Sequence, residues 1–423
     1  MDWISELPEA LLLRILSSVP AKDVVATMVL SKRWQFLWTR VPRLVYDDSY
    51  DDDIEFVKFS RFVDRSLVFH EAPVFETLHF KLCKRACASD DVRVWIKAAE
   101  NRGVRELIIH IDKSSCKNPA ILPRNLYNGC RVLVTLKLNN AVFVDASSSP
   151  VSFPSLKTLS LVSVKYPGDE FVKSLLSNCP VLEDLHVRRC DNDNVTIFTI
   201  KVPFLKRISL DQKSDGNKDG AHGLVIDAPS LEIFHIVDYI NAFCVIEKEM
   251  ANIVEADIDT TNSHPGKILS SIVSVKRLNL CLGISKEAYP VGTVFHSLVH
   301  ITLCTCETAW LNLLMCLLGD SPKLKSLKLR QRHIIEDHNL RPCWTEPSSV
   351  PECLLSSLET FTWEDYEGTQ EEKEVAAFIL RSASCLKKVT ISSTATDSDK
   401  KLEMIKELSL SSRRSPTCQL TFD

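Results

Sequence analysis

Cysteine is the residue of this chain with the widest range of possible chemistry, because a thiolate can bind a metal, form a disulfide or act as a nucleophile. The 423-residue sequence holds 15 cysteines, an odd number, and no CxxC motif. Its closest pairs are Cys83 with Cys87 and Cys304 with Cys306. The last two would share one face of a strand, yet two sulfurs without nearby partners are a poor zinc site. We therefore expect reduced, mostly buried cysteines, with no metal and no cofactor.

Sequence motifs that organise common active sites are missing from the chain. It has no GxGxxG, GxxxxGKS/T, HExxH or GxSxG motif. Its 11 glycines leave little material for phosphate-binding loops. A catalytic cluster assembled in space from the 11 histidines and the acidic residues is a minor alternative. The sequence thus predicts a protein that is not an enzyme and has no catalytic residues.

Composition and charge narrow the class of protein and its partners. Hydrophobic residues make up 45% and charged residues 25% of the chain, which argues against wholesale disorder. A net charge of −4 gives no global electrostatic case for binding nucleic acid. There is no apolar run of about 18 residues and no secretory pattern at the start. We expect a soluble intracellular protein, cytoplasmic or nuclear or both, without membrane or nucleic-acid partners.

A repeat organises most of the sequence beyond residue 72. Each copy has an apolar residue, two others, an apolar residue, one other and a third apolar residue, often after proline. Leu156, Leu159 and Leu161 form a clear copy. From Leu133 to Leu324, successive first positions are 23, 26, 23, 26, 22, 22, 23 and 26 residues apart. This spacing falls within the about 20–29 residues of leucine-rich repeats.

The physics of the repeat predicts a solenoid. The last two apolar positions alternate with polar ones, as in a short strand with one buried face. Such strands become stable when they stack in parallel and share a continuous core. Residues 170–176 and 310–315 have helical patterns and would return along the outer surface. An unrelated α/β domain whose strands share this pattern is the alternative.

Polar residues that alternate with the buried pair of each strand would line the concave face of the solenoid. Their charge is mixed, acidic around Glu255 to Asp259 and basic around Lys328 to Arg332. Such a surface suits a protein segment of complementary charge, although a solvated face without partner, or a phosphate or small-ligand site near the basic strand, is an alternative. The candidate substrate-binding residues are His186, Arg188, Arg207, His235, Asp257, Asp259, Arg277, Lys328 and Arg330.

The first 42 residues carry three short helical patterns. Pro8 near the start and Pro20 after the end delimit the first. Residues 24–29 form the second, and Ser31 is a candidate N-cap for a third that ends before Pro42. Helices this short cannot enclose so many large apolar side chains by themselves. Part of this surface must rest on the rest of the chain, as an ordinary cap, or on another protein, and we favour the second.

The same segment resembles a known family of domains. The matching residues are Leu7-Pro8, Ile15-Leu16-Ser17 and Leu30-Ser31-Lys32-Arg33-Trp34, followed by Leu37-Trp38. They resemble the F-box of the plant F-box/FBD/leucine-rich-repeat proteins. The resemblance implies docking on a Skp-type adaptor and, through it, on a cullin–RING ubiquitin ligase. It also implies the adaptor-binding residues Leu7, Pro8, Ile15, Leu16, Val29, Leu30, Arg33, Trp34 and Trp38.

Two other segments flank the repeats. The acidic stretch from Tyr46 to Asp53 predicts a solvated turn before a helix with Phe56, Phe59 and Phe62 on one face. From Trp344 onward the chain resembles the FBD domain of the same proteins, with a strand at 358–363, a helix at 370–382 and another strand. The expected boundaries are 1–45 for the F-box, 46–72 for a helical linker, 73–340 for the repeats and 341–423 for the FBD-like region.

Together these features predict an α/β chain. A three-helix F-box would precede a curved leucine-rich-repeat solenoid with short parallel strands and an FBD-like cap. The family resemblance implies the substrate-recognition subunit of an SCF-type (Skp–cullin–F-box) E3 ubiquitin ligase. In that role the F-box docks on the adaptor and the repeats bind an unknown target protein. A non-proteolytic scaffold that binds a partner without promoting ubiquitination is the alternative.

Overall fold

A computed structural model of the protein forms two compact units, the first ending at Leu205 and the second beginning at Lys206. The described residues are 4–49, 56–83, 89–112, 120–144, 151–190, 193–212, 222–240, 243–260, 265–282, 289–290, 292–307, 309–333, 344–393 and 397–422.

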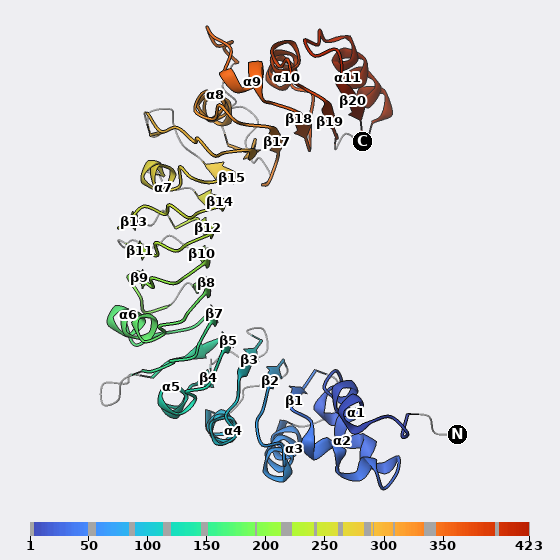
Figure 1. The fold of residues 1–423 in the computed structure, drawn as a ribbon, viewed down its shortest axis with the longest axis vertical. Coiled ribbons are helices and arrows are strands. Elements are labelled where there is room, and N and C mark those ends of the chain that lie inside the picture. Colours follow the sequence, from blue (N-terminus) through green and yellow to red (C-terminus); the bar gives the residue numbers. More distant parts are fainter. Residues whose placement is uncertain are drawn as a thin grey trace. The chain divides into compact units, whose positions relative to one another are not determined.

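The first unit begins with short helices and continues as parallel strands joined by helices (Figure 1). Its elements are α1 (Glu9–Leu16), α2 (Ala21–Ala26), the 3₁₀ helices η1 (Thr27–Val29) and η2 (Trp34–Arg40), β1 (Arg43–Asp47), α3 (Phe56–Phe69), β2 (Thr77–Leu82), α4 (Ser89–Asn101), β3 (Glu106–Ile111), β4 (Ala120–Ile121), α5 (Asn125–Gly129), β5 (Thr135–Asn139), β6 (Ala141–Val142), β7 (Thr158–Val162), α6 (Asp169–Ser177), β8 (Asp184–Arg188) and β9 (Ile197–Lys201).

The main sheet of the first unit is parallel, in the order β1-β2-β3-β5-β7-β8. Its register places the second apolar position of each repeat beside that of the next. Because the buried face of every strand then meets the same core, one ladder of leucines runs across the sheet. Its members are Leu78, Leu107, Leu136, Leu159 and Leu185, all of them buried.

The second unit repeats this arrangement and ends in the FBD-like region (Figure 1). Its elements are β10 (Arg207–Gln212), β11 (Gly223–Asp227), β12 (Ile233–Asp238), β13 (Phe243–Ile246), β14 (Glu255–Thr260), α7 (Gly266–Ser271), β15 (Arg277–Leu282), β16 (His300–Cys304), α8 (Trp310–Gly319), β17 (Ser326–Arg330), α9 (Glu352–Ser356), β18 (Thr360–Trp363), α10 (Gln370–Ser382), β19 (Lys388–Ile391), α11 (Ser398–Leu410) and β20 (Gln419–Phe422).

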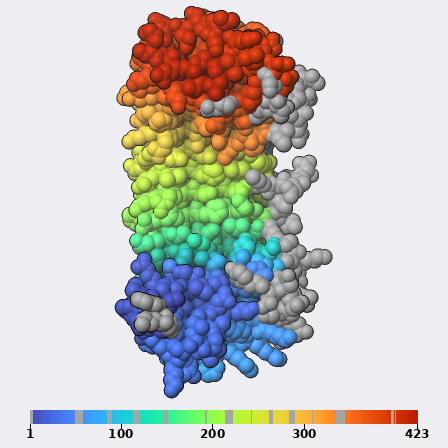
Figure 2. All heavy atoms as spheres, turned by 90° about the vertical axis from the view of Figure 1, so that its right-hand side faces the viewer, coloured from blue at the N-terminus to red at the C-terminus, as the bar shows by residue number. Residues whose placement is uncertain are grey.

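The main sheet of the second unit is also parallel, and neighbouring strands follow one another in the chain from β14 to β20. Figure 2 shows this stacking as successive bands of colour within the unit, from green to dark red. The FBD-like region continues the sheet, because β18 pairs with β17 and is followed in register by β19 and β20. The predicted helix 370–382 is confirmed as α10, and each predicted repeat coincides with a strand.

Two local expectations need correction. The third N-terminal helix is a 3₁₀ helix, and the Ser31 hydroxyl does not cap it but is buried without a hydrogen-bond partner among the described residues. The stretch from Tyr46 does not start as a solvated turn, because Tyr46 is a buried residue of β1 and its hydroxyl hydrogen-bonds Ser66.

Candidate functional site

Apolar side chains on the N-terminal helices divide into a buried set and an exposed set. Leu12, Leu16, Val24, Trp34 and Leu37 are buried, as the helical periodicity requires. The exposed set lies on α1, on η1 with its following residue, and on η2, and η2 packs against both other elements. We call it the N-terminal apolar face, formed by Leu11, Ile15, Met28, Val29, Leu30 and Phe36, of which Val29 is 83% and Leu30 63% exposed.

Arg33 and Trp34 hold the start of the chain against this helical segment. The Arg33 guanidinium donates hydrogen bonds to the carbonyl oxygens of Ser5 and Leu7. The indole Nε1 of Trp34 donates to the Ser5 hydroxyl at 2.7 Å. These bonds hold residues 5–7 against the helical segment, and the buried Trp34 thereby stabilises the shape of the N-terminal apolar face.

The helical segment is also fixed to the first repeat of its own unit. Backbone amides of Glu71 and Ala72 donate to the Thr39 carbonyl at 2.7 and 3.0 Å. The amide of Glu76 donates to the Pro42 carbonyl at 2.8 Å, and α2 packs against β1. The N-terminal helices therefore form one body with the beginning of the sheet.

The predicted adaptor-binding residues fall into three groups by exposure. Pro8, Ile15, Val29, Leu30 and Arg33 are exposed, and Leu7 and Trp38 are half-buried. Leu16 and Trp34 are buried in the chain's own core. Helical spacing could have identified the additional exposed residues, which the sequence prediction omitted, namely Leu11, Met28 and Phe36.

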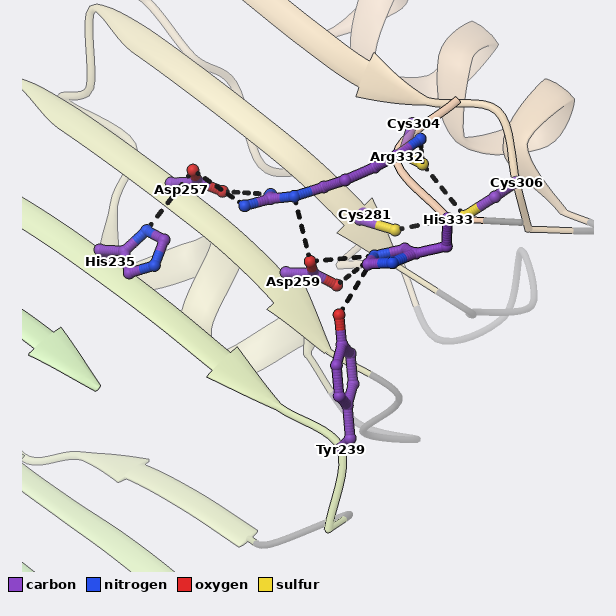
Figure 3. A network of polar contacts seen from close by, with 9 residues as sticks. All are labelled: His235, Tyr239, Asp257, Asp259, Cys281, Cys304, Cys306, Arg332 and His333. Carbon is purple, nitrogen blue, oxygen red and sulfur yellow. Dashed lines mark hydrogen bonds and ion pairs between the residues drawn. The ribbon is translucent and has the colours of Figure 1, made fainter. Parts of the chain in front are cut away.

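A second candidate site lies on the face of the second unit's sheet that is opposite its apolar core (Figure 3). Asp257 and Asp259 project from β14, where Ala256 and Ile258 face the core. Arg332, just beyond β17, reaches across to both. Its Nη1 lies 2.7 Å from Asp257 Oδ1, and its Nε lies 3.2 Å from Asp259 Oδ2. One guanidinium thus ties the end of β17 to a strand that is three places away in the sheet.

Two histidines complete what we call the β14 ion-pair network, formed by His235, Asp257, Asp259, Arg332 and His333. His235 Nδ1 lies 3.4 Å from Asp257, and His333 Nε2 lies 3.1 Å from Asp259. The Tyr239 hydroxyl is 3.1 Å from the same His333 nitrogen. The Asp259 side chain is only 3% exposed, so a ligand on this face would contact its partners Arg332 and His333 and not the carboxylate itself.

Electrostatic interactions in the network favour the charged forms of Asp257 and Arg332. Burial opposes ionisation of Asp257, but hydrogen bonds from His235 and Arg332 outweigh it and hold the pKa of Asp257 below its usual value. The carboxylates of Asp257 and Asp259 raise the pKa of Arg332 despite its desolvation. Burial and the nearby Asp259 carboxylate raise the pKa of Tyr239, so its phenol stays protonated. Arg332 therefore offsets part of the negative charge of the two carboxylates.

Three cysteines lie beside this network and form what we call the thiol cluster, Cys281, Cys304 and Cys306. The Sγ atoms of Cys304 and Cys306 are 3.0 Å apart, and those of Cys281 and Cys306 are 3.5 Å apart. Hydrogen bonds with the Cys281 and Cys306 thiols lower the pKa of Cys304. Hydrogen bonds with the Cys304 and Cys306 thiols raise the pKa of Cys281. Of the residues the structure describes, these three and the set of Asp259, Cys281 and His333 offer the most cysteine and histidine ligands to a metal.

Other predicted residues of the face occupy separate places. Arg277 pairs with Glu255 at 2.7 Å, and Lys328 with Glu364 at 2.7 Å. Arg330 is half-buried in β17, and Arg207 is exposed in β10. His186 and Arg188 belong to β8 of the first unit. The sequence analysis missed Tyr239 and His333, which follow the carboxyl ends of strands, and that position is the signal that could have found them.

A search of the described helices finds none with the length and apolar character needed to cross a lipid bilayer. This result concerns helices in the described ranges alone.

Comparison with known families gives three matches along the chain. Residues 4–46 match the model for the F-box domain, and residues 346–391 match the model for FBD. Residues 92–256 match the model described as FBD-associated F-box protein At5g56370, LRR repeats. The three matches follow one another in the order expected from the sequence.

Similar proteins of Arabidopsis thaliana match over almost their whole length. The Probable FBD-associated F-box protein At1g32375 is 63% identical over 100% of both chains. The F-box/FBD/LRR-repeat protein At5g56420 is 48% identical over 100% of this chain and 99% of its own. A solved structure, titled Crystal structure of TLR13-ssRNA13 complex, has a TM-score of 0.42 at 13% identity, covering 78% of this chain and 52% of that chain. That likeness is too distant to bear on function.

Proposed function

Because the chain belongs to the family of FBD-associated F-box proteins with leucine-rich repeats, we propose that it is the substrate-recognition subunit of an SCF-type E3 ubiquitin ligase. The N-terminal apolar face would dock on a Skp-type adaptor, and the polar face of the repeats would hold a target protein. Ubiquitin transfer would belong to the partner machinery, and the chain itself would supply no catalytic residue.

The observation that carries this proposal is the exposure of the N-terminal apolar face. Scattered apolar residues on a surface are ordinary. Here six of them lie within 26 residues, from Leu11 to Phe36, on or next to three helical elements of which η2 packs against the other two. Because Ile15, Val29 and Leu30 are already partly buried, covering them against a partner would contribute roughly 3–6 kcal/mol before the costs of association. That contribution favours an interface centred on this face.

The hydrogen-bonded join between the helices and the first repeat supports a function in which the chain brings a target close to the ligase. The hydrogen bonds of Thr39 and Pro42 fix the docking face to the first strands of its unit. A target held by the repeats of that unit would then keep a defined position with respect to the adaptor. Such positioning raises the effective concentration of target and transferred group. We also propose a cytoplasmic or nuclear location, where such ligases work.

Co-expression of the full-length chain with a Skp-type adaptor, followed by size-exclusion chromatography, tests the proposal. We expect one complex of equal stoichiometry. A soluble chain that elutes without adaptor would contradict the docking role.

The target-recognition half needs its own readout. In plant cells that carry a variant without adaptor binding, the proteins that the wild-type chain removes should accumulate. Adaptor binding without any change in the half-life of bound proteins would instead favour the non-proteolytic scaffold.

A further inference from the structure

The thiol cluster acquires partners in the fold that its sequence spacing does not supply. Cys281 follows Leu280 in β15, and Cys304 follows Leu303 in β16, and these two leucines are register partners. The two thiols therefore lie on neighbouring strands, on the face away from the leucine core. Cys306 follows two residues later, and the segment after β17 brings His333 beside Cys281.

The spacing of the sulfur atoms suits a shared metal ion. All three lie within 4.8 Å of one another, and the pairs at 3.0 and 3.5 Å are far longer than a disulfide bond of about 2.05 Å. Zinc–sulfur bonds of about 2.3 Å place tetrahedral sulfur ligands about 3.8 Å apart. Small rotations about the cysteine side-chain bonds would bring the sulfurs to that separation. His333 lies in a group with Cys281 and Asp259, and its ring would turn toward Cys304 and Cys306 to complete the set.

The surrounding charges favour a cation at this place. Cys281 and Cys304 are buried, and the carboxylates of Asp259 and Glu307 lie near the cluster. Three thiolates beside two carboxylates would repel one another, whereas a divalent ion would offset that repulsion.

Hydrogen bonds are already placed to support metal ligands. The backbone amide of Arg332 donates to Cys304 Sγ at 3.2 Å. His333 Nε2 is held by Asp259 at 3.1 Å and by Tyr239 at 3.1 Å. Among the residues the structure describes, His333 Nδ1 has no hydrogen-bond partner, so this nitrogen is available. A histidine that binds metal through one nitrogen and a carboxylate through the other is a common arrangement in zinc proteins.

We propose that Cys281, Cys304, Cys306 and His333 bind one zinc ion, with Asp259 orienting the imidazole. Each cysteine that is still protonated would release its thiol proton to solvent as its sulfur–zinc bond forms. The ion would join β15, β16 and the segment after β17, and so fix Arg332 over the polar face of the repeats. This site is independent of adaptor docking and of the proposed ligase role.

Metal analysis of the full-length chain tests the site. The protein is purified without a polyhistidine tag from zinc-supplemented medium, and bound metal is measured by mass spectrometry. We expect roughly one zinc per chain. Replacement of zinc by cobalt(II) should give the visible bands of a tetrahedral thiolate site. Cys306→Ser should reduce bound zinc at least about tenfold.

A matched control and a second variant keep the result interpretable if Cys306→Ser fails to fold. Cys385→Ser replaces an exposed cysteine outside the cluster and should retain the full zinc content. His333→Cys keeps four ligands and should retain zinc while strengthening the sulfur-to-cobalt charge-transfer band.

Three outcomes would overturn the site. They are a folded wild-type chain with background zinc, zinc retained when all three clustered cysteines are replaced by serine, and a disulfide among these cysteines in protein kept under reducing conditions.

Discussion

The N-terminal apolar face and the β14 ion-pair network use their side chains in opposite ways. At the N-terminus, Val29 and Leu30 are exposed although the chain has an apolar core beside them. On β14, by contrast, the charges of Asp257 and Asp259 are matched within the chain by Arg332, His235 and His333. The described residues leave the first surface uncovered, whereas the charges of the second are paired within the chain.

This difference separates affinity from selectivity. Covering apolar side chains gains free energy with any partner of fitting shape, and it is insensitive to salt. A ligand of the polar face must replace ion pairs that the chain already makes, so unmatched ligands are rejected. A common adaptor suits the first surface, and a specific target suits the second.

The largest expected effect comes from charging the apolar face. Val29→Asp combined with Leu30→Asp should weaken adaptor binding at least about 100-fold, because two carboxylates would be buried without partners. Binding is measured by isothermal titration calorimetry with the full-length chain. Val68→Asp is the matched control, since Val68 is 74% exposed but lies on α3 outside this face. Equal losses in both variants would break the comparison.

The next effect tests whether the polar face is held by its own ion pairs. Arg332→Met leaves the almost fully buried Asp259 with His333 as its remaining ion-pair partner. We expect a loss of about 2–3 kcal/mol in the free energy of unfolding, measured by urea denaturation. Arg277→Met removes an exposed pair with Glu255 on the same face and should cost less than about 1 kcal/mol. Similar losses would show that the network has no special role.

A third prediction concerns the join between the helices and the first repeat. Burial lowers the pKa of His70 to about 4, below its unfolded value of 6.5. The unfolded chain therefore takes up the proton first, and His70 destabilises the fold as pH falls from 6.5 towards 4. Between pH 6.5 and 5 this amounts to at most about 2 kcal/mol. His70→Phe should unfold with a shallower pH dependence in urea, and an unchanged slope would contradict the assignment.

The smallest effect is expected in the FBD-like region. Thr369 and Glu372 form a capping box at the start of α10, in which each accepts a hydrogen bond from the other's backbone amide. Thr369→Ala should cost about 1 kcal/mol of stability. Gln370→Ala, at the next position, is exposed and should change stability by less than that. Thermal unfolding followed by circular dichroism distinguishes the two.

The repeat strands could be predicted because their signal is local and periodic. The spacing of Leu156, Leu159 and Leu161 within six residues predicts β7. Helix α10 was also predictable, since its apolar face and its cap lie within one segment. The β1 strand was not, because acidic residues follow Tyr46 directly and the strand pairs with β2, whose partner residues lie 34 positions later.

The polar site was only half predictable, for a related reason. Alternation along β14 placed Asp257 and Asp259 on one face. No sequence rule indicated that Arg332 would return over that face to meet them 75 residues away. The division of the N-terminal residues into exposed and buried was likewise set by packing, which buried Trp34 and left Phe36 exposed.

Hydrogen–deuterium exchange on the full-length chain with and without a Skp-type adaptor tests the central claim most directly. Amide exchange in peptides from residues 4–40 should slow on binding, while peptides of β14 to β17 should exchange at unchanged rates. Slowing confined to the repeat strands, or no change within residues 4–40 in a formed complex, would contradict the assignment of the two faces.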